Sequence, residues 1–253
     1  MLKIAPTERF SSRVETYVRF RPSYPPGVID VLRDECGLSR ESVIADVASG
    51  TGLLTRLLLQ NGNRVFGVEP NPDMRRAGEE YLAGFPNFTS VAGTAESTTL
   101  PDHAVGLITS AQAAHWFKRE EALKEFQRIL KPSCYLALVF NDRQVKGSVF
   151  ADDYEELVVK YGTDYSEVQR LGRIFEGDEF FAPFKCEKRT LPNHQVLNYP
   201  ALEGRLLSSS YAPQAGDPSH EPMLADLRRM FDKHQRGGLV RMEYDTNIYF
   251  GKL

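Results

Sequence analysis

Short apolar runs alternate with amphipathic segments between residues 43 and 140, and this alternation constrains the fold more than any other feature. The apolar runs have the length of strands that are buried on both faces, whereas the amphipathic segments carry apolar side chains at helical spacing. Strands are predicted over residues 43–48, 64–69, 88–93, 104–111 and 135–140, and helices over 51–60, 72–83 and 120–130. Such alternation indicates a parallel sheet with helices on both faces.

The segments on either side of this region follow other patterns. The polar, proline-containing N-terminal part has one predicted helix, Val28–Glu35. Beyond residue 141, helical patterns are predicted over 148–176 and 200–235, the second with a loop at 212–222, and a sixth strand over 186–192. The last residues alternate apolar and polar side chains, which predicts an antiparallel strand at or near the sheet edge. We therefore expect an N-terminal lid segment (1–40), a ligand-binding core (41–141) and a helical cap with the last two strands (142–253).

Composition and charge narrow the class of protein. The 253 residues are 42% hydrophobic and 26% charged, which is typical of a globular chain with one large α/β domain or a domain with an added cap. The formal net charge is −3 and no dense basic block is present, so nucleic acid is not an expected partner. No apolar run has the length of a membrane span and no signal-peptide pattern begins the sequence, so we expect a cytoplasmic protein without a membrane partner.

A glycine-containing turn follows the first predicted strand. Gly50 and Gly52 lie between that strand and the next helix, where a side chain would block the approach of a ligand to the backbone. The start of the helix supplies unpaired N–H donors, and Glu69 ends the second strand, where its carboxylate can accept from both hydroxyls of a ribose. This pattern predicts a doubly wound fold that binds an adenosine-containing ligand at the carboxyl ends of its strands.

Two residues distinguish between adenosine-containing ligands. A dinucleotide site has the spacing G-x-G-x-x-G, and Thr55 stands at its third glycine position. Asp46 lies at the end of the first strand, where an acid is unfavourable beside a pyrophosphate but suits a ligand with a cationic or hydroxyl-bearing group. The residues therefore favour S-adenosylmethionine, which carries an ammonium and a sulfonium. A nicotinamide oxidoreductase is the weaker alternative.

Four stretches resemble class I S-adenosylmethionine-dependent methyltransferases, in particular the small-molecule branch that includes trans-aconitate methyltransferase. They are YVRFRPSYP (17–25), DVASGTG (46–52), AGTAESTTLPDHAVGLITSAQAAHWF (92–117) and LLSSSYAPQAGDP (206–218). The resemblance spans almost the whole chain. It implies a Rossmann-like, doubly wound seven-stranded sheet, mostly parallel with an antiparallel C-terminal strand, together with a helical cap. Ala48, Ser49 and Thr94 depart from the family pattern, which usually has Gly or Cys near the first two positions and often Asp at the third.

The resemblance also implies roles for individual residues. Gly50 and Gly52 would carry the methionyl part of S-adenosylmethionine past the turn, and Asp46 would help to hold its ammonium. Thr94 and Ala95 would flank the adenine. The whole set of cofactor-binding residues implied in this way is Asp46, Ala48, Ser49, Gly50, Gly52, the ribose-binding Glu69, Pro70, Thr94, Ala95, Glu96 as a substitute partner of the adenine, Gln112 beside the sulfonium, and Arg21 and Tyr17 of the N-terminal segment.

Methyl transfer is an in-line displacement that mainly needs alignment in a site without water. The five histidines have no metal-ligand spacing, so no metal is expected. His115 follows the fourth predicted strand, where it could act as a general base for a hydroxyl or amine. The alternative is that His115 and Trp116 form the pocket wall, because a carboxylate acceptor needs no base.

The acceptor is expected to be a small molecule, such as a carboxylate or a hydroxyl compound. The string Ser110-Ala111-Gln112-Ala113 differs from the N-P-P-Y motif of amino-methyltransferases, and the loop lacks the nucleophilic cysteine of base C5-methyltransferases. His115, Trp116, Tyr211 and Arg143 are the candidate acceptor-binding residues. The main alternative to an S-adenosylmethionine-dependent methyltransferase is a protein that binds the cofactor without catalysis and has a regulatory or assembly role.

Overall fold

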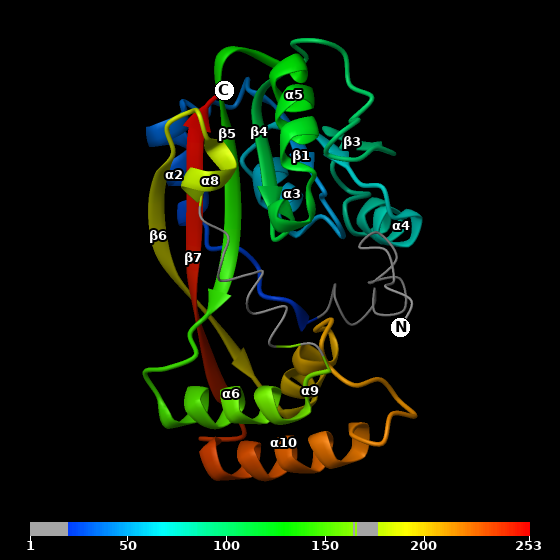
Figure 1. Cartoon of the computed structure of the whole chain (residues 1–253), viewed down its shortest axis with the longest axis vertical. Coiled ribbons are helices and arrows are strands. Elements are labelled where there is room, and N and C mark those ends of the chain that lie inside the picture. The colour runs from blue at the N-terminus through cyan, green and yellow to red at the C-terminus, as the bar shows by residue number, and fades with distance from the viewer. Residues whose placement is uncertain (1–19, 164, 166–176) are drawn as a thin grey trace.

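One seven-stranded sheet runs through the molecule, with the strand order β3-β2-β1-β4-β5-β7-β6 (Figure 1). The computed structural model describes residues 20–163, 165 and 177–253. The strands are β1 (Val43–Val47), β2 (Arg64–Val68), β3 (Phe88–Val91), β4 (Val105–Ala111), β5 (Leu130–Arg143), β6 (Glu187–Leu197) and β7 (Val240–Lys252). β1 to β5 pair in parallel with one another, and β7 is antiparallel to both β5 and β6. The expected mostly parallel sheet with an antiparallel C-terminal strand is confirmed.

Helices connect these strands, and the end of α2 has a clear cause in the sequence. They are α2 (Gly27–Cys36), α3 (Leu53–Gln60), α4 (Pro72–Tyr81), the short 3₁₀ helix η3 (Ala114–Trp116), α5 (Arg119–Ile129), α6 (Val149–Tyr161), α8 (Gly177–Phe181), α9 (Tyr199–Leu207) and α10 (His220–His234). Gly37 ends α2 at a φ of 69°, a left-handed conformation that glycine adopts without strain. In the described part of the chain, no helix has the length and apolar character needed to cross a membrane.

The two faces of the sheet bury separate apolar cores. Alternate residues of a strand point to opposite faces, so Ala137 and Val139 of β5 pack with α2 and α3, whereas Leu136 and Leu138 pack with α5 and α8. All four of these side chains are fully buried. Helices on both faces therefore fix the sheet, and they leave the carboxyl ends of the parallel strands open toward the rest of the molecule (Figure 1).

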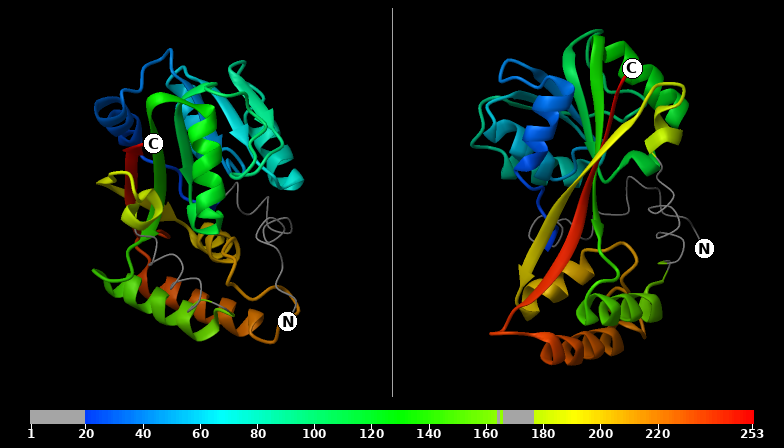
Figure 2. Two further views of the ribbon diagram at one scale, coloured as in Figure 1. Left: turned by 45° about the horizontal axis from the view of Figure 1, so that its top comes forward. Right: turned by 90° about the vertical axis from the view of Figure 1, so that its left-hand side faces the viewer.

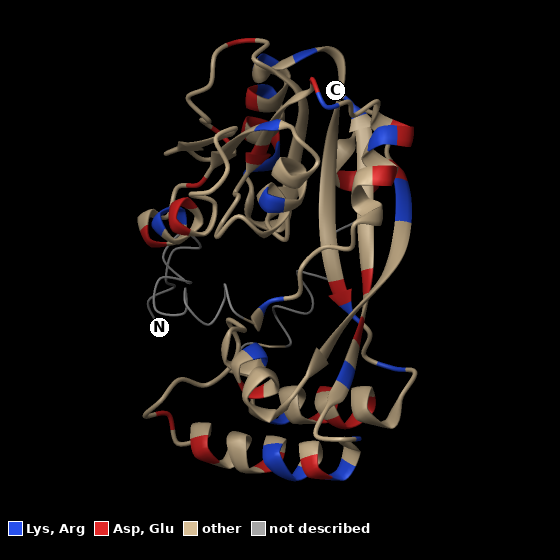
Figure 3. Cartoon of the chain, turned by 180° about the vertical axis from the view of Figure 1, so that it is seen from behind, with Lys and Arg blue, Asp and Glu red and all other residues tan. Residues whose placement is uncertain are grey.

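Three long strands carry a second lobe. β5, β6 and β7 extend well beyond the parallel part of the sheet, as Figure 2 shows, and α6, α9 and α10 pack at their far end. The core of this lobe holds apolar side chains from all three helices, among them Leu157, Leu202 and Leu227. Charged residues of both signs lie along the outer side of α10 (Figure 3), as expected for an amphipathic surface helix.

The outer elements differ in length from their predicted ranges. β5 is 14 residues long and runs through position 141, where the core was expected to end, and β6 continues five residues past its predicted range to Leu197. Both strands were underestimated because their outer parts are polar. The predicted helix over 148–176 is shorter, since α6 ends at Tyr161, and residues 166–176 lie outside the described part of the chain.

Candidate cofactor-binding site

A cavity of about 350 Å³ opens at the carboxyl ends of the parallel strands. Nine residues that the sequence singled out contribute to its wall: Ala48, Gly50, Glu69, Pro70, Thr94, Ala95, Glu96, Gln112 and Trp116. They come from the segments that follow β1, β2, β3 and β4. The cavity has the size and the mixture of apolar and polar groups typical of a small-molecule site.

The turn after β1 has a conformation that requires glycine. Gly50 and Gly52 have φ values of 58° and 86°. A Cβ atom added to Gly52 would lie 2.6 Å from Cδ1 of Leu82, which is itself buried. A Cβ on Gly50 would lie 3.4 Å from Cε of Met74, so there the conformation matters more than the space. Gly50 lines the cavity, whereas Gly52 begins α3 and shapes the turn from outside it.

Glu69 holds the two sides of the cavity together. Its Oε2 accepts a hydrogen bond of 2.9 Å from the backbone N–H of Gly50, and its Oε1 accepts one of 2.8 Å from the N–H of Asn71. Burial raises the pKa of Glu69, although both hydrogen bonds oppose that rise. A carboxylate has about four acceptor positions, so two remain for ligand hydroxyls. Glu69 is thus both a structural link and a free acceptor in the cavity wall.

Asp46 lies beneath the turn and is not among the residues lining the cavity. It is 1% exposed, and its two oxygens accept from Thr55 Oγ1 at 2.5 Å and Thr109 Oγ1 at 2.8 Å. Burial raises the pKa of Asp46 to about 6, against the effect of the two threonine hydroxyls. In this position Asp46 ties β1 to α3 and β4. The residue that replaces the third glycine of a dinucleotide site, Thr55, therefore has a defined partner.

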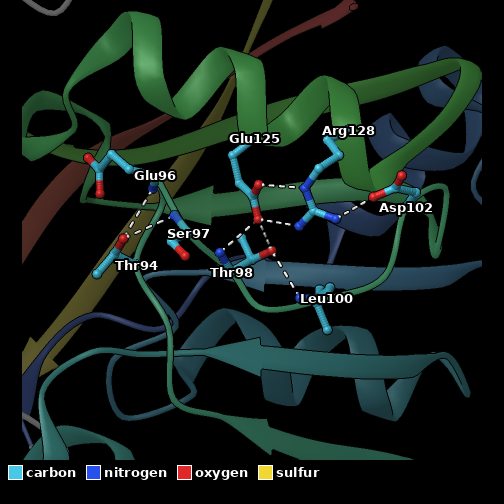
Figure 4. Close-up of polar contacts among 8 residues, drawn as sticks. All are labelled: Thr94, Glu96, Ser97, Thr98, Leu100, Asp102, Glu125 and Arg128. Carbon is cyan, nitrogen blue, oxygen red and sulfur yellow. Dashed lines mark hydrogen bonds and ion pairs between the residues drawn. The ribbon is translucent and has the colours of Figure 1, made fainter.

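The loop after β3 forms another part of the wall. The hydroxyl oxygen of Thr94 accepts from the N–H groups of Glu96 and Ser97 at 3.2 and 3.1 Å (Figure 4). Glu96 in turn accepts from the N–H of Lys118 at 2.9 Å, which joins this loop to the segment that follows β4. The departure from the family pattern at Thr94 thus has a structural use, because its oxygen closes the turn that positions Ala95 and Glu96.

A charged network fixes the same loop to α5 (Figure 4). Glu125 accepts from both the N–H and the hydroxyl of Thr98, and from Arg128, which also binds Asp102 at 2.6 Å. Burial alone would raise the pKa of Glu125, but the hydrogen bonds from Arg128 and Thr98 lower it to about 2. Both ends of the segment 98–102 are therefore attached to one helix.

Two non-glycine residues with positive φ lie in the cavity wall. Ala48 has a φ of 55° and Gln112 a φ of 57°. Such conformations cost about 1 to 3 kcal/mol and are concentrated at functional sites. The Gln112 amide is held by a hydrogen bond of 3.0 Å from Nε2 to the carbonyl of Asn141 on β5. Gln112 is the residue that the family resemblance predicts beside the sulfonium, so one of the two strained positions coincides with that prediction.

His115 lies behind the wall that Trp116 forms. The ring centroids of His115 and Trp116 are 4.6 Å apart, and those of His115 and Phe140 are 6.3 Å apart. Burial lowers the pKa of His115 to about 4, and its Nδ1 has no hydrogen-bond partner among the described residues. His115 is therefore uncharged at neutral pH. Trp116 lines the cavity, whereas His115 is not among the lining residues.

Several expected site residues lie away from this cavity. Ser49 belongs to the turn after β1 without lining the cavity, and Arg21 donates through Nη2 to the carbonyl of Ser208 at 2.8 Å. Arg143 and Tyr211 belong to the second lobe, where the Tyr211 ring packs edge-on against Tyr165. Tyr17 is outside the described residues.

Sequence reasoning missed six residues of the wall, namely Asn71, Met74, Ala111, Ala113, Phe117 and Lys118. A signal existed for Asn71, because an asparagine before a proline marks the start of a helix. Its Oδ1 caps α4 by accepting from the N–H groups of Asp73 and Met74. Phe117 and Lys118 directly follow the HW pair, but no periodicity indicates that the chain turns back into the cavity there.

Comparisons with known proteins agree with this geometry. Residues 45–138 match the protein family described as "Methyltransferase domain". An uncharacterized methyltransferase-like protein of Schizosaccharomyces pombe is 37% identical over 135 residues, which are 53% of this chain and 52% of that protein. An uncharacterized methyltransferase of Mycobacterium tuberculosis is 38% identical over 134 residues, covering 53% of this chain and 52% of its own. The matched region thus spans about half the length of these relatives.

The fold has a solved counterpart over nearly the whole chain. The structure of a putative type II methyltransferase from Anaeromyxobacter dehalogenans superimposes with a TM-score of 0.69 and 22% identity, covering 92% of this chain and 98% of that one. At this identity the likeness concerns the fold. An uncharacterized methyltransferase of Geobacillus sp. is 32% identical over 154 residues, which are 56% of this chain and 71% of that protein. With this relative and the family match, the chain belongs to the class I S-adenosylmethionine-dependent methyltransferases.

Proposed function

We propose that the protein transfers a methyl group from S-adenosylmethionine to a small-molecule acceptor. The observation that carries this proposal is Glu69, which is buried in the wall of the cavity and keeps acceptor positions free while it binds Gly50 and Asn71. When bound, S-adenosylmethionine supplies a methyl group on a positively charged sulfur. The protein's own task is then to orient the cofactor and the acceptor and to exclude water.

The residues of the cavity fit this cofactor. Glu69 offers a carboxylate to ribose hydroxyls, and the glycine turn allows a ligand to approach the backbone of Gly50. Ala95 and Trp116 provide apolar surface for a base and for the sulfonium end, where an aromatic face is electrostatically favourable. Asp46 would act on the ammonium only through the turn above it, because Asp46 is 1% exposed and does not line the cavity.

The acceptor would approach from the second lobe, toward which the carboxyl ends of the parallel strands point (Figure 1). We propose that His115 supports the wall formed by Trp116 and does not act as a base. A group with a pKa of about 4 has little tendency to take a proton from a hydroxyl or an amine. This favours an acceptor that reacts in its ionised form, such as a carboxylate. The specific resemblance to the trans-aconitate branch remains a prediction.

Cofactor binding is tested by thermal unfolding with S-adenosylmethionine and its demethylated product. A ligand at 100 times its Kd stabilises a protein by about 2.7 kcal/mol, which corresponds to about 5 to 10 °C for a chain of this size. Glu69→Gln should weaken binding by about 10- to 100-fold, the range of a hydrogen bond to a charged group. Glu80→Gln, an exposed position on α4, is the matched control. The absence of a shift with either ligand would refute the proposal.

Methyl transfer itself is tested by incubating the protein with S-adenosylmethionine and a metabolite extract, followed by mass spectrometry. A compound that gains 14 mass units only with the active protein supports an enzyme. The alternative, a protein that binds the cofactor without catalysis, is favoured by the use of Thr94 in a turn rather than as a partner of the base. That alternative predicts a thermal shift but no methylated product.

A further inference from the structure

A second cavity, of about 160 Å³, lies in the second lobe where β5 ends and α6 begins. It shares no lining residue with the cofactor cavity. Its wall consists of the loop between β5 and α6, the first turns of α6, and residues 241–243 of β7. At about 30 Å³ for each water molecule, the cavity has room for roughly five waters, which is the scale of a small polyatomic ion.

The wall of this cavity is rich in basic groups. Arg143, Lys146 and Arg241 contribute to it, against a single acid, Glu243, which forms an ion pair with Arg241. Arg143 pairs with Glu155 of α6. Among the described residues, Lys146 forms no ion pair. Among the described residues of its wall, the cavity therefore has more basic groups than acids.

Two buried donors at this cavity lack hydrogen-bond partners in the part of the chain that the structure describes. The Nη2 atom of Arg143 binds Glu155 and the hydroxyl of Tyr165, but its Nη1 atom is buried without a hydrogen bond among the described residues. The hydroxyl of Tyr154, a residue that is 1% exposed, is in the same state. The Arg143 guanidinium lies 4.8 Å from the centroid of the Tyr154 ring. An unsatisfied buried donor costs about 1 to 3 kcal/mol, so two at one cavity indicate a missing acceptor.

The start of α6 adds further donors. Ser148 caps this 13-residue helix by accepting from the N–H of Ala151 at 3.1 Å, and Ser148, Phe150 and Ala151 all line the cavity. The first N–H groups of a helix have no partner within it and attract anions. Here the helix start and the two unsatisfied side chains belong to one cavity.

A second buried cation lies deeper in the same lobe. Arg205 is 6% exposed and donates to the hydroxyl of Tyr244 at 3.1 Å and to that of Ser209 at 3.0 Å, both of which are neutral. No acid among the described residues pairs with it. The charges of Arg205 and Arg143 both act on the phenol of Tyr154. Among the described residues, Glu155 is the only acid that binds either guanidinium, so one negative charge faces the two positive charges of Arg143 and Arg205 there.

We propose that the second cavity binds a small oxyanion, a phosphate or a carboxylate group, at a site separate from the one for methyl transfer. The anion would accept from Nη1 of Arg143, from Tyr154 and from the first N–H groups of α6. Lys146 and Arg241 at the mouth would attract it. The site does not depend on the proposed function, because none of these residues lines the cofactor cavity.

Binding is tested by isothermal titration with inorganic phosphate and, separately, with acetate, at an ionic strength held constant with sodium chloride. The wild-type chain should bind one of the two saturably, and that anion identifies the preferred geometry. Removing Arg143 could disturb folding, so the variants are Lys146→Gln and Arg241→Gln, whose side chains are exposed. Each should weaken binding at least fivefold. The matched control is Arg228→Gln, an exposed arginine on α10.

Saturable binding that is lost in the two variants and kept in the control supports the site. The proposal is overturned if neither anion binds saturably, or if both variants bind like the wild type. A Tyr154→Phe variant gives a second readout, because it removes one unsatisfied donor without changing the charge. If the anion accepts from that hydroxyl, this variant should bind more weakly, yet without anion it should be at least as stable as the wild type, because it no longer buries an unsatisfied donor.

Discussion

Replacing Asp46 by asparagine should change how stability depends on pH. Asp46 is buried beneath the glycine turn, and burial raises its pKa from 3.8 to about 6 in the folded chain. Asparagine has nearly the same shape and can still bond to Thr55 and Thr109, accepting from one hydroxyl and donating to the other. The variant therefore removes the ionisation of the group while keeping its contacts.

The size and sign of this change in the free energy of unfolding follow from the pKa of Asp46. A shift of about two units corresponds to about 3 kcal/mol at 1.36 kcal/mol per unit. Because the pKa is higher in the folded chain than in the unfolded chain, the folded chain binds the proton more tightly. The stabilisation that this proton gives to the folded chain is fully present below pH 3.8 and is lost as the pH rises to about 6. The free energy of unfolding of Asp46→Asn minus that of the wild type should therefore rise by about 2 kcal/mol between pH 4 and pH 7, because part of the effect is already present at pH 4.

The wild-type profile alone would hide this effect. Burial lowers the pKa of His115 from 6.5 to about 4, so the unfolded chain binds that proton more tightly and stability increases with pH over the same window. The contributions of Asp46 and His115 have opposite signs and similar size. Only the difference between the variant and the wild type isolates the carboxyl group.

Urea unfolding followed by circular dichroism, at half-unit steps from pH 4 to pH 7.5, measures that difference. Glu80→Gln, which changes an exposed acid, should give a difference that hardly varies with pH. If the difference for Asp46→Asn is equally flat, the carboxyl group is not buried as described. A fall with rising pH would mean that the charged form is the one stabilised in the folded chain.

Three further outcomes are expected. Gly52→Ala should destabilise the chain by about 2 kcal/mol in urea unfolding, because its Cβ would lie 2.6 Å from Leu82, whereas Gly84→Ala, with nothing within 4 Å, should not. Glu125→Gln should weaken S-adenosylmethionine binding severalfold by releasing the loop after β3. Unchanged affinity would mean that this loop keeps its position without the Glu125 carboxylate. An NMR titration of the His115 ring should give a pKa of about 4, and a value near 6.5 would contradict its burial.

The core of the fold could be read from the sequence because its strands are buried on both faces. Such strands are continuous apolar runs, and the residues that end them, including Glu69 and Gln112, necessarily gather at one edge. The outer strands gave a weaker signal. β6 is largely exposed along its length, so its polar residues conceal a pairing with β7 that only the tertiary structure determines.

The residues of the candidate site also divide into those that the sequence could place and those that it could not. The positions of Gly50, Glu69 and Ala95 depend on local turns and strand ends, and their lining of the cavity was predictable. Asp46 and Arg143 could not be placed in this way, because the depth of a side chain depends on partners distant in sequence. Thr109, 63 residues away, is one of the two that bind Asp46, and Arg143 contacts Glu155 and Tyr165 of the second lobe.

The position of β7 between β5 and β6 has a consequence for the order of folding. β6, at the sheet edge, pairs along its whole length with β7, which is made more than 40 residues later. During synthesis, the parallel strands can assemble early, but β6 waits without its neighbour until Val240–Lys252 has emerged. The sheet and the second lobe are therefore completed in one late step. Slow synthesis or loss of β7 would leave an exposed 11-residue edge that is open to pairing with other chains.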